Sequence, residues 1–128
     1  MAIIKNWSKT IIKISDSLET AIKVLDSAGF QIALVADNNC KLLGTITDGD
    51  IRRALIKGLR MDCFAGDVMN RSPETALESN TYDFIISKMK IRKLSHIPII
   101  NENNVLIGLE TIHHLNSDKK YDNPVFLM

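Results

Sequence analysis

Apolar and polar positions follow the same order twice along the chain, at a constant separation of 64 residues. The segment from Asp37 to Gly44 reads like the segment from Asn101 to Gly108, with turn-forming polar residues first and apolar residues before the glycine. Further matched positions are Ser15 with Ser79, Ile22 with Ile86, Leu25 with Met89, Val35 with Ile99 and Thr47 with Thr111. A period of this kind indicates a duplicated structural unit, with copies at about 7–69 and 70–118.

The first copy predicts a strand, a helix, two strands and a second helix. Asp16 and Glu19 stand three residues apart, as at a capped helix start, and Gly29 suits the left-handed turn that ends a helix. The apolar residues between them follow helical spacing, at Leu18, Ala21, Ile22 and Leu25. The remaining expected elements are strands over 32–36 and 42–46, a turn at 37–39 and a helix from near Thr47 to Gly58.

The second copy predicts the same order of elements. Asn80 is expected to open its first helix, and Ile85, Ile86 and Met89 form the apolar stripe. The expected strands cover 97–100 and 105–109, and a shorter helix starts at Thr111.

These patterns predict an α/β (α+β) fold of two βαββα repeats packed with pseudo-two-fold symmetry. One repeat of about 60 residues is marginal alone, so the two are expected to bury each other's open faces. The predicted division is 1–69 for the first repeat with its N-terminal segment, 70–118 for the second, and 119–128 for a linker into a further domain. The symmetry creates two equivalent clefts, bordered by the helix starts at Thr47 and Thr111.

The segment from Gly44 to Ile51 carries the most informative chemistry. Gly44 allows a backbone or a ligand to approach closely. Thr47 stands at a helix start, where free backbone N–H groups favour an anion such as phosphate. Asp50, one turn on, suits the two hydroxyls of a ribose, as acidic residues do in dinucleotide sites. The same Thr-x-x-Asp spacing also describes an ordinary capping box, so the segment alone leaves both interpretations open.

Taken together, these features make the chain similar to a tandem pair of cystathionine β-synthase (CBS) domains. The resemblance rests on the repeat, the order of elements, the segments Gly44–Asp50 and Ile97–Asn101, and the segment Asp67–Met69 before the second copy. It implies a non-catalytic regulatory module that binds an adenine nucleotide (AMP, ADP or ATP) in a cleft between the repeats, and that forms a homodimer.

The resemblance also implies roles for individual residues. Thr47 would bond a phosphate, Asp50 the ribose hydroxyls, and Thr45 would line the adenosine pocket. The second copy would hold the base through backbone bonds and apolar contact of Thr75, Ala76, Ile97 and Pro98, while Lys93 and His96 could reach phosphate. The second cleft would use Ile11, Ile12, Ala33, Leu34, Thr111 and His114.

The second copy departs from the family pattern at two positions. His114 replaces the ribose-binding acid, and Glu110 stands where an apolar strand residue is usual. A neutral histidine offers a single acceptor where a carboxylate offers several. We therefore expect the Asp50 cleft to be the better site and the Thr111 cleft to be weak or empty.

Composition excludes several other classes of function. The formal net charge is +1 and aromatic residues make up 5%, so neither duplex nor single-stranded nucleic acid is an expected partner. Apolar runs fall far short of the about 20 residues that span a membrane, and no signal-peptide pattern opens the chain. Cys40 and Cys63 form no CxxC pair and are expected to be reduced thiols of a cytoplasmic protein. The adjacent His113 and His114 would point in different directions on a helix, so no metal site is expected.

The last residues suggest what the module could regulate. Tyr121 to Met128 contains an Asn-Pro turn signal followed by a short apolar run. This run either packs as a small strand of this domain or continues into another one, and it resembles the entry to a sugar-phosphate nucleotidyltransferase domain. The leading hypothesis is therefore a nucleotide-sensing module that controls such an attached catalytic domain. The alternative is a dimerisation module that senses no ligand. No nucleophile, base and orienting group stand together, so an enzyme activity of this segment itself is not expected.

Overall fold

The computed structural model describes residues 7–28 and 30–111. Its elements are η1 (Trp7–Thr10), β1 (Ile11–Ile12), α1 (Leu18–Ala28), β2 (Ile32–Ala36), β3 (Leu42–Thr47), α2 (Asp48–Ile56), η2 (Ala65–Asp67), β4 (Ala76–Leu77), α3 (Tyr82–Arg92), β5 (His96–Ile100) and β6 (Leu106–Thr111). The order agrees with the predicted one throughout the first repeat, and as far as β6 in the second. The helix expected from Thr111 and the segment 119–128 lie outside the described residues, while Thr111 itself ends β6.

Each repeat forms a three-stranded sheet with the same pairing. The first strand of each repeat runs parallel to the second, and the second and third strands form an antiparallel hairpin. The register keeps the predicted separation, because Ile12 pairs with Val35 as Ala76 pairs with Ile99. The irregularity between Val35 and Ala36 recurs 64 residues later, between Ile99 and Ile100. The fold of two packed repeats is therefore confirmed down to the strand register.

The two hairpin ends join the repeats about a pseudo-two-fold axis. Leu42 N donates to Asn104 O at 3.0 Å, and Leu106 N donates to Cys40 O at 2.9 Å. Between these bonds Lys41 pairs with Val105, its own counterpart in the repeat. Each contact thus has its symmetry-related copy, as in an isologous dimer interface. Buried side chains from both sheets fill the space behind it: Ile32, Leu34, Ala36, Leu42, Leu106 and Leu109.

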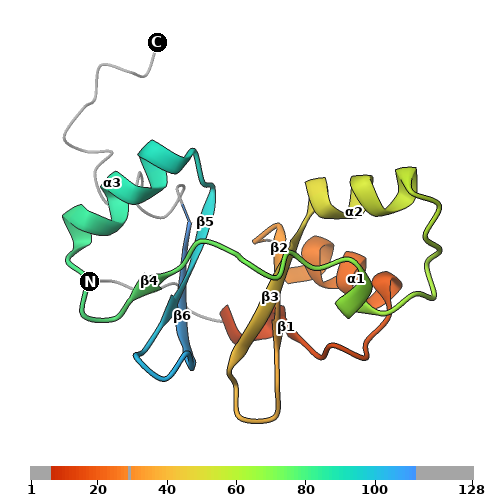
Figure 1. The fold of residues 1–128 in the computed structure, drawn as a ribbon, viewed down its shortest axis with the longest axis horizontal. Helices are drawn as coiled ribbons and strands as arrows, with labels where there is room; N and C mark the ends of the chain where they lie inside the picture. The colour runs from red at the N-terminus through yellow and green to blue at the C-terminus, as the bar shows by residue number, and fades with distance from the viewer. Residues whose placement is uncertain (1–6, 29, 112–128) are drawn as a thin grey trace.

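The helices cover the outer faces of the two sheets. Figure 1 shows the sheets side by side in the centre, with α3 outside one and α1 and α2 outside the other. The predicted apolar stripe of α1 faces the sheet, since Leu18 and Ala21 are fully buried and Leu25 is nearly so. The arrangement is a four-layer stack of helix, sheet, sheet and helix, in which each sheet buries one face on helices and the other on its twin.

Two helix starts lie one residue away from the predicted ones. Ser17 caps α1, since its Oγ accepts from Thr20 N at 3.2 Å, while the Asp16 carboxylate accepts from Lys13 N instead. Thr81 caps α3 by accepting from Phe84 N at 3.1 Å, whereas Asn80 accepts from Leu77 N. Both pairs are neighbouring residues of capping type, and the turn geometry decides which one faces the helix.

Candidate functional site

A cavity of about 530 Å³ lies between the two repeats, a volume within the range of small-molecule sites. Its walls come from the end of β3 and the first turn of α2 in one repeat, and from the start of β5 in the other. The connecting segment between the repeats, green in Figure 1, crosses in front of both sheets and supplies a further wall. The lining residues of the first repeat and connection are Gln31, Ile32, Thr45, Thr47, Asp48, Gly49, Asp50, Arg53, Asn70, Ser72, Pro73 and Glu74.

Gly44 holds the connecting segment against β3 at the edge of this cavity. Thr45 N donates to Asn70 O at 3.1 Å, and Asn70 N returns a bond to Thr45 O at 2.8 Å. A Cβ atom on Gly44 would stand 2.7 Å from Asn70 O and 2.8 Å from Met69 Sδ. The predicted close approach at Gly44 is therefore made by the protein's own backbone.

Alternation along β3 sends Thr45 and Thr47 to the cavity and Ile46 to the core under the helices. Thr47 is the N-cap of α2. Its backbone N and its Oγ1 both donate to Asp50 Oδ2, at 2.9 Å and 3.1 Å. The capping-box interpretation of this pair is thus observed, and the same two side chains line the cavity.

The second repeat faces these groups with Lys93, Leu94, Ser95, His96 and Pro98. Lys93 ends α3 in the left-handed conformation, with φ of 56°, where a glycine is the usual residue. Its counterpart by the 64-residue separation is Gly29, which lies outside the described residues. A lysine at this strained position places a cation at the cavity wall, opposite the first turn of α2.

Three of the predicted base contacts do not line the cavity. Ile97 and Ala76 are buried against α3, because alternation along β5 turns Ile97 away when His96 and Pro98 face the cavity. Thr75 is also absent from the lining, and its carbonyl accepts from Lys88 Nζ at 2.6 Å. The role expected for Thr75, Ala76 and Ile97, which is to hold the base through backbone bonds and apolar contact, therefore stays a prediction.

Sequence reasoning missed the contribution of the connecting segment. Asn70, Ser72, Pro73 and Glu74 all line the cavity, and Glu74 forms an ion pair with Lys88 at 3.6 Å. The Ser-Pro dipeptide is a turn signal, but nothing in the pattern indicates which surface a turn will face. The structure also separates the two neighbouring arginines of α2, since Arg53 lines the cavity and Arg52 does not.

The residues predicted for the second cleft are mostly packed in cores. Ile12 and Ala33 lie in the core under α1, and Leu34 lies in the core between the sheets. Ile11 packs against that same central core, and Thr111 is buried at the end of β6. Glu110, the expected departure from the family pattern, is fully buried as well. His114 lies outside the described residues, so the second cleft stays a prediction.

Within residues 7–28 and 30–111, no group of three or more His, Cys, Asp or Glu side chains could hold a metal ion. In the same residues no helix is long and apolar enough to cross a bilayer. Cys40 and Cys63 are free thiols.

The family model of the CBS domain matches twice, at residues 8–57 and 65–115. The chain belongs to the CBS domain family. Both matches coincide with the structural repeats, so the molecule is a tandem CBS pair, and such a module is typically regulatory rather than catalytic.

Solved CBS pairs share this architecture. The CBS domain protein PAE2072 from Pyrobaculum aerophilum, complexed with AMP, superposes with a TM-score of 0.73 at 23% identity, covering 82% of this chain and 81% of that one. The CBS domain pair of protein MJ0100, in complex with 5′-methylthioadenosine and S-adenosyl-L-methionine, gives a TM-score of 0.76 at 23% identity over 88% of each chain. At this identity the likeness establishes the fold.

Curated relatives are longer enzymes. The arabinose 5-phosphate isomerase KdsD of Francisella tularensis is 27% identical over 106 residues, which cover 82% of this chain and 32% of the isomerase. The inosine-5′-monophosphate dehydrogenase of Methanocaldococcus jannaschii is 28% identical over 115 residues, covering 88% of this chain and 22% of the dehydrogenase. The chain thus spans about a third or less of the length of these relatives.

Proposed function

We propose that this CBS pair is a regulatory module that binds an adenine nucleotide in the cavity between its repeats. The observation that carries the proposal is the convergence of Thr45, Thr47 and Asp50 from one repeat with Lys93 and His96 from the other around one cavity. The complexes of similar CBS proteins with AMP and S-adenosyl-L-methionine support the ligand class.

The chemistry of the lining suits the parts of such a ligand. The first-turn N–H groups of α2 favour a phosphate, whereas both donors of Thr47 are bonded to Asp50, and Lys93 adds a positive charge at the cavity wall. Asp50 offers acceptors for the ribose hydroxyls. Pro98, Leu94 and Ile32 supply apolar surface for the base. The choice among AMP, ADP and ATP depends on how many phosphates reach Lys93.

Regulation would follow from linkage between the two repeats. A ligand that contacts both repeats favours one relative placement of them, and an attached domain responds only as far as the ligand distinguishes the placements. We propose that the controlled domain follows residue 118 in the parent protein. Asp122 to Met128 resembles the entry of a sugar-phosphate nucleotidyltransferase, although these residues lie outside the described ones. The two curated relatives named above are an isomerase and a dehydrogenase, and they lend that identity no support.

Thermal unfolding with AMP, ADP and ATP tests the binding function. A nucleotide at 100 times its dissociation constant raises the free energy of unfolding by about 2.7 kcal/mol. Asp50→Asn removes the carboxylate charge but keeps an acceptor for Thr47 N, so the α2 cap largely survives. A hydrogen bond to a charged group is worth about 1.5–3 kcal/mol, which predicts about 10- to 100-fold weaker nucleotide binding for Asp50→Asn by titration calorimetry.

Asp83→Asn is the matched control, because Asp83 is an exposed carboxylate in the first turn of α3 and does not line the cavity. It changes the charge of a helix start equally and should bind as the parent chain does. Equal affinity of Asp50→Asn and the parent chain would remove Asp50 from the site. The absence of a thermal shift with any of the three nucleotides at millimolar concentration would overturn the binding function itself.

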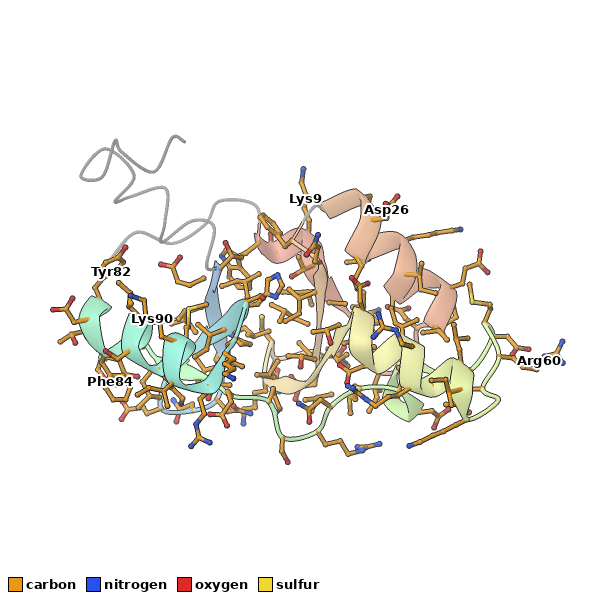
Figure 2. The ribbon with its side chains drawn as sticks, turned by 90° about the horizontal axis from the view of Figure 1, so that it is seen from above. Lys9, Asp26, Arg60, Tyr82, Phe84 and Lys90 are labelled. Atoms are coloured by element: carbon orange, nitrogen blue, oxygen red, sulfur yellow. The ribbon has the colours of Figure 1, made fainter. Side chains whose placement is uncertain are left out.

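The absence of a thermal shift with all three nucleotides would favour the alternative of a dimerisation module that senses no ligand. A specific observation supports self-association: Phe84 and Ile91 are exposed by 51% and 78% on α3, whereas their counterparts in α1 are the polar Thr20 and Ser27. Phe84 stands on the outside of the molecule, at the left of Figure 2. A homodimer through this face is compatible with either function, and sedimentation velocity measures it directly.

A further inference from the structure

The Asp50 carboxylate is almost fully engaged within the protein. Its Oδ2 accepts two hydrogen bonds from Thr47, and its Oδ1 accepts one from Arg53 Nη2 at 2.7 Å. A carboxylate has about four acceptor positions, two on each oxygen. One position on Oδ1 therefore remains, while the two hydroxyls of a ribose bring two donors.

Arg53 is the partner that can leave. The Asp50 side chain is 12% exposed and is fixed by the N-cap of α2, whereas the Arg53 side chain is 66% exposed. Releasing Thr47 would open the helix start, but releasing Arg53 breaks only an ion pair at the surface. A ribose that binds Asp50 through both hydroxyls thus displaces the guanidinium from Oδ1.

The displaced guanidinium already lies at the first turn of α2. Nη1 and Nη2 of Arg53 each stand 3.4 Å from the point where a Cβ of Gly49 would be. Gly49 and Asp48 also line the cavity, at the turn where the phosphate of the proposed ligand would bind. A small rotation of the exposed side chain is enough to exchange the carboxylate for a phosphate oxygen, which the planar guanidinium binds equally well.

We propose that Arg53 is a specificity-determining residue that makes the cavity prefer phosphorylated nucleosides over free nucleosides. This inference rests on the proposed function of the cavity. A nucleoside breaks the ion pair between Asp50 and Arg53 and offers the guanidinium no anionic group in place of the carboxylate. A nucleotide breaks the same ion pair and supplies a phosphate in its place. The cost of opening the site is the same for both ligands, and only the nucleotide recovers it.

Titration calorimetry with AMP and with adenosine tests this selectivity in the parent chain, Arg53→Met and Arg52→Met. Arg53→Met keeps an unbranched, flexible side chain, although a shorter one, and removes its charge. We expect AMP to bind about tenfold or more weakly, and adenosine to bind as well as before or a few-fold tighter, so the ratio of the two affinities falls at least tenfold. Arg53→Lys keeps the charge without the planar fork and should retain part of the ratio.

Arg52→Met is the matched control, since Arg52 is the adjacent exposed arginine of α2 outside the cavity lining. It removes the same charge and should change both affinities by less than twofold. An unchanged ratio in Arg53→Met, or an equal loss for AMP and adenosine, overturns the role of Arg53 while leaving nucleotide binding in place. Failure of the parent chain to bind AMP overturns the proposed function, and the role of Arg53 with it.

Discussion

Cys40 occupies a position where the internal symmetry of the chain predicts a better residue. It is the last residue of the hairpin turn in the first repeat, with φ of 62°, and its counterpart Asn104 has φ of 66°. Asparagine tolerates this left-handed conformation, whereas other non-glycine residues are strained there. Asn104 Nδ2 also donates to Leu42 O at 2.9 Å, while Cys40 Sγ stands 4.0 Å from the equivalent Leu106 O. Cys40→Asn should therefore complete the symmetry of the junction.

The magnitude follows from three contributions. Relief of left-handed strain is worth about 1 kcal/mol and a new hydrogen bond about 1 kcal/mol. Part of this is offset because the half-buried Cys40 side chain packs against the central core, a contact worth up to about 1 kcal/mol. We expect Cys40→Asn to raise the free energy of unfolding by about 1 kcal/mol, which for a chain of this size raises Tm by about 3–5 °C.

Urea unfolding of four variants separates the contributions. Cys40→Gly relieves the strain without the hydrogen bond, Cys40→Ser removes the thiol with neither gain, and Asn104→Cys makes the opposite change in the second repeat. The expected order of stability is Cys40→Asn above the parent chain, and Asn104→Cys about 1–2 kcal/mol below it. If Cys40→Asn is no more stable than Cys40→Ser, or Asn104→Cys costs nothing, the symmetry argument is wrong.

Two further predictions concern the connection between the repeats and the thiol beside it. In the same urea unfolding assay, Gly44→Ala should lower the free energy of unfolding by about 2–4 kcal/mol, because its Cβ would stand 2.7 Å from Asn70 O and would break the two hydrogen bonds there. Gly49→Ala is the control. Its Cβ would meet only the flexible end of Arg53, so this variant should be neutral or slightly stabilising. Burial, and then the nearby Asp67 and Asp62, raise the pKa of Cys63 above its ordinary value. A raised pKa in the folded state contributes stability that is fully present below the pKa of the thiol in the unfolded chain, and that is lost as the pH rises through its pKa in the folded chain. The free energy of unfolding of the parent chain should therefore fall above pH ~9, and that of Cys63→Ser should fall less. Parallel pH profiles of the two chains would contradict this.

The repeat and its strands were predictable because hairpins are encoded locally. Asp37 and Asn101 each accept two backbone hydrogen bonds in their turns, from residues two and four positions later, and this chemistry is visible in the residue types. The fixed separation of 64 residues then predicts the elements of one copy from those of the other. The register of both sheets follows, since the apolar positions that match in sequence also match in pairing.

The details of the cavity wall depended on choices that residue types do not encode. Strand alternation places His96 and Pro98 on one face of β5 and Ile97 on the other. The sequence does not reveal which of these two faces lines the cavity. The contact of Arg53 with Asp50 depends on the rotamer of a long exposed side chain. The course of the connecting segment depends on Gly44, whose missing side chain admits Asn70.

The contact between the two repeats is symmetric, whereas the groups that would bind a ligand are not. A two-fold contact must be complementary to itself, so Cys40 O and Asn104 O accept equivalent bonds and Lys41 meets its own counterpart Val105. A ligand has no such symmetry, and two of the charged groups that would bind it occur once, although Thr47 recurs as Thr111. Asp50 corresponds to His114, and Arg53 corresponds to Ser117. The anion and the cation that together would admit a nucleotide were thus kept, or gained, on one side of the axis alone. We therefore expect duplication to have produced two clefts, of which divergence at these two positions favours nucleotide binding in one.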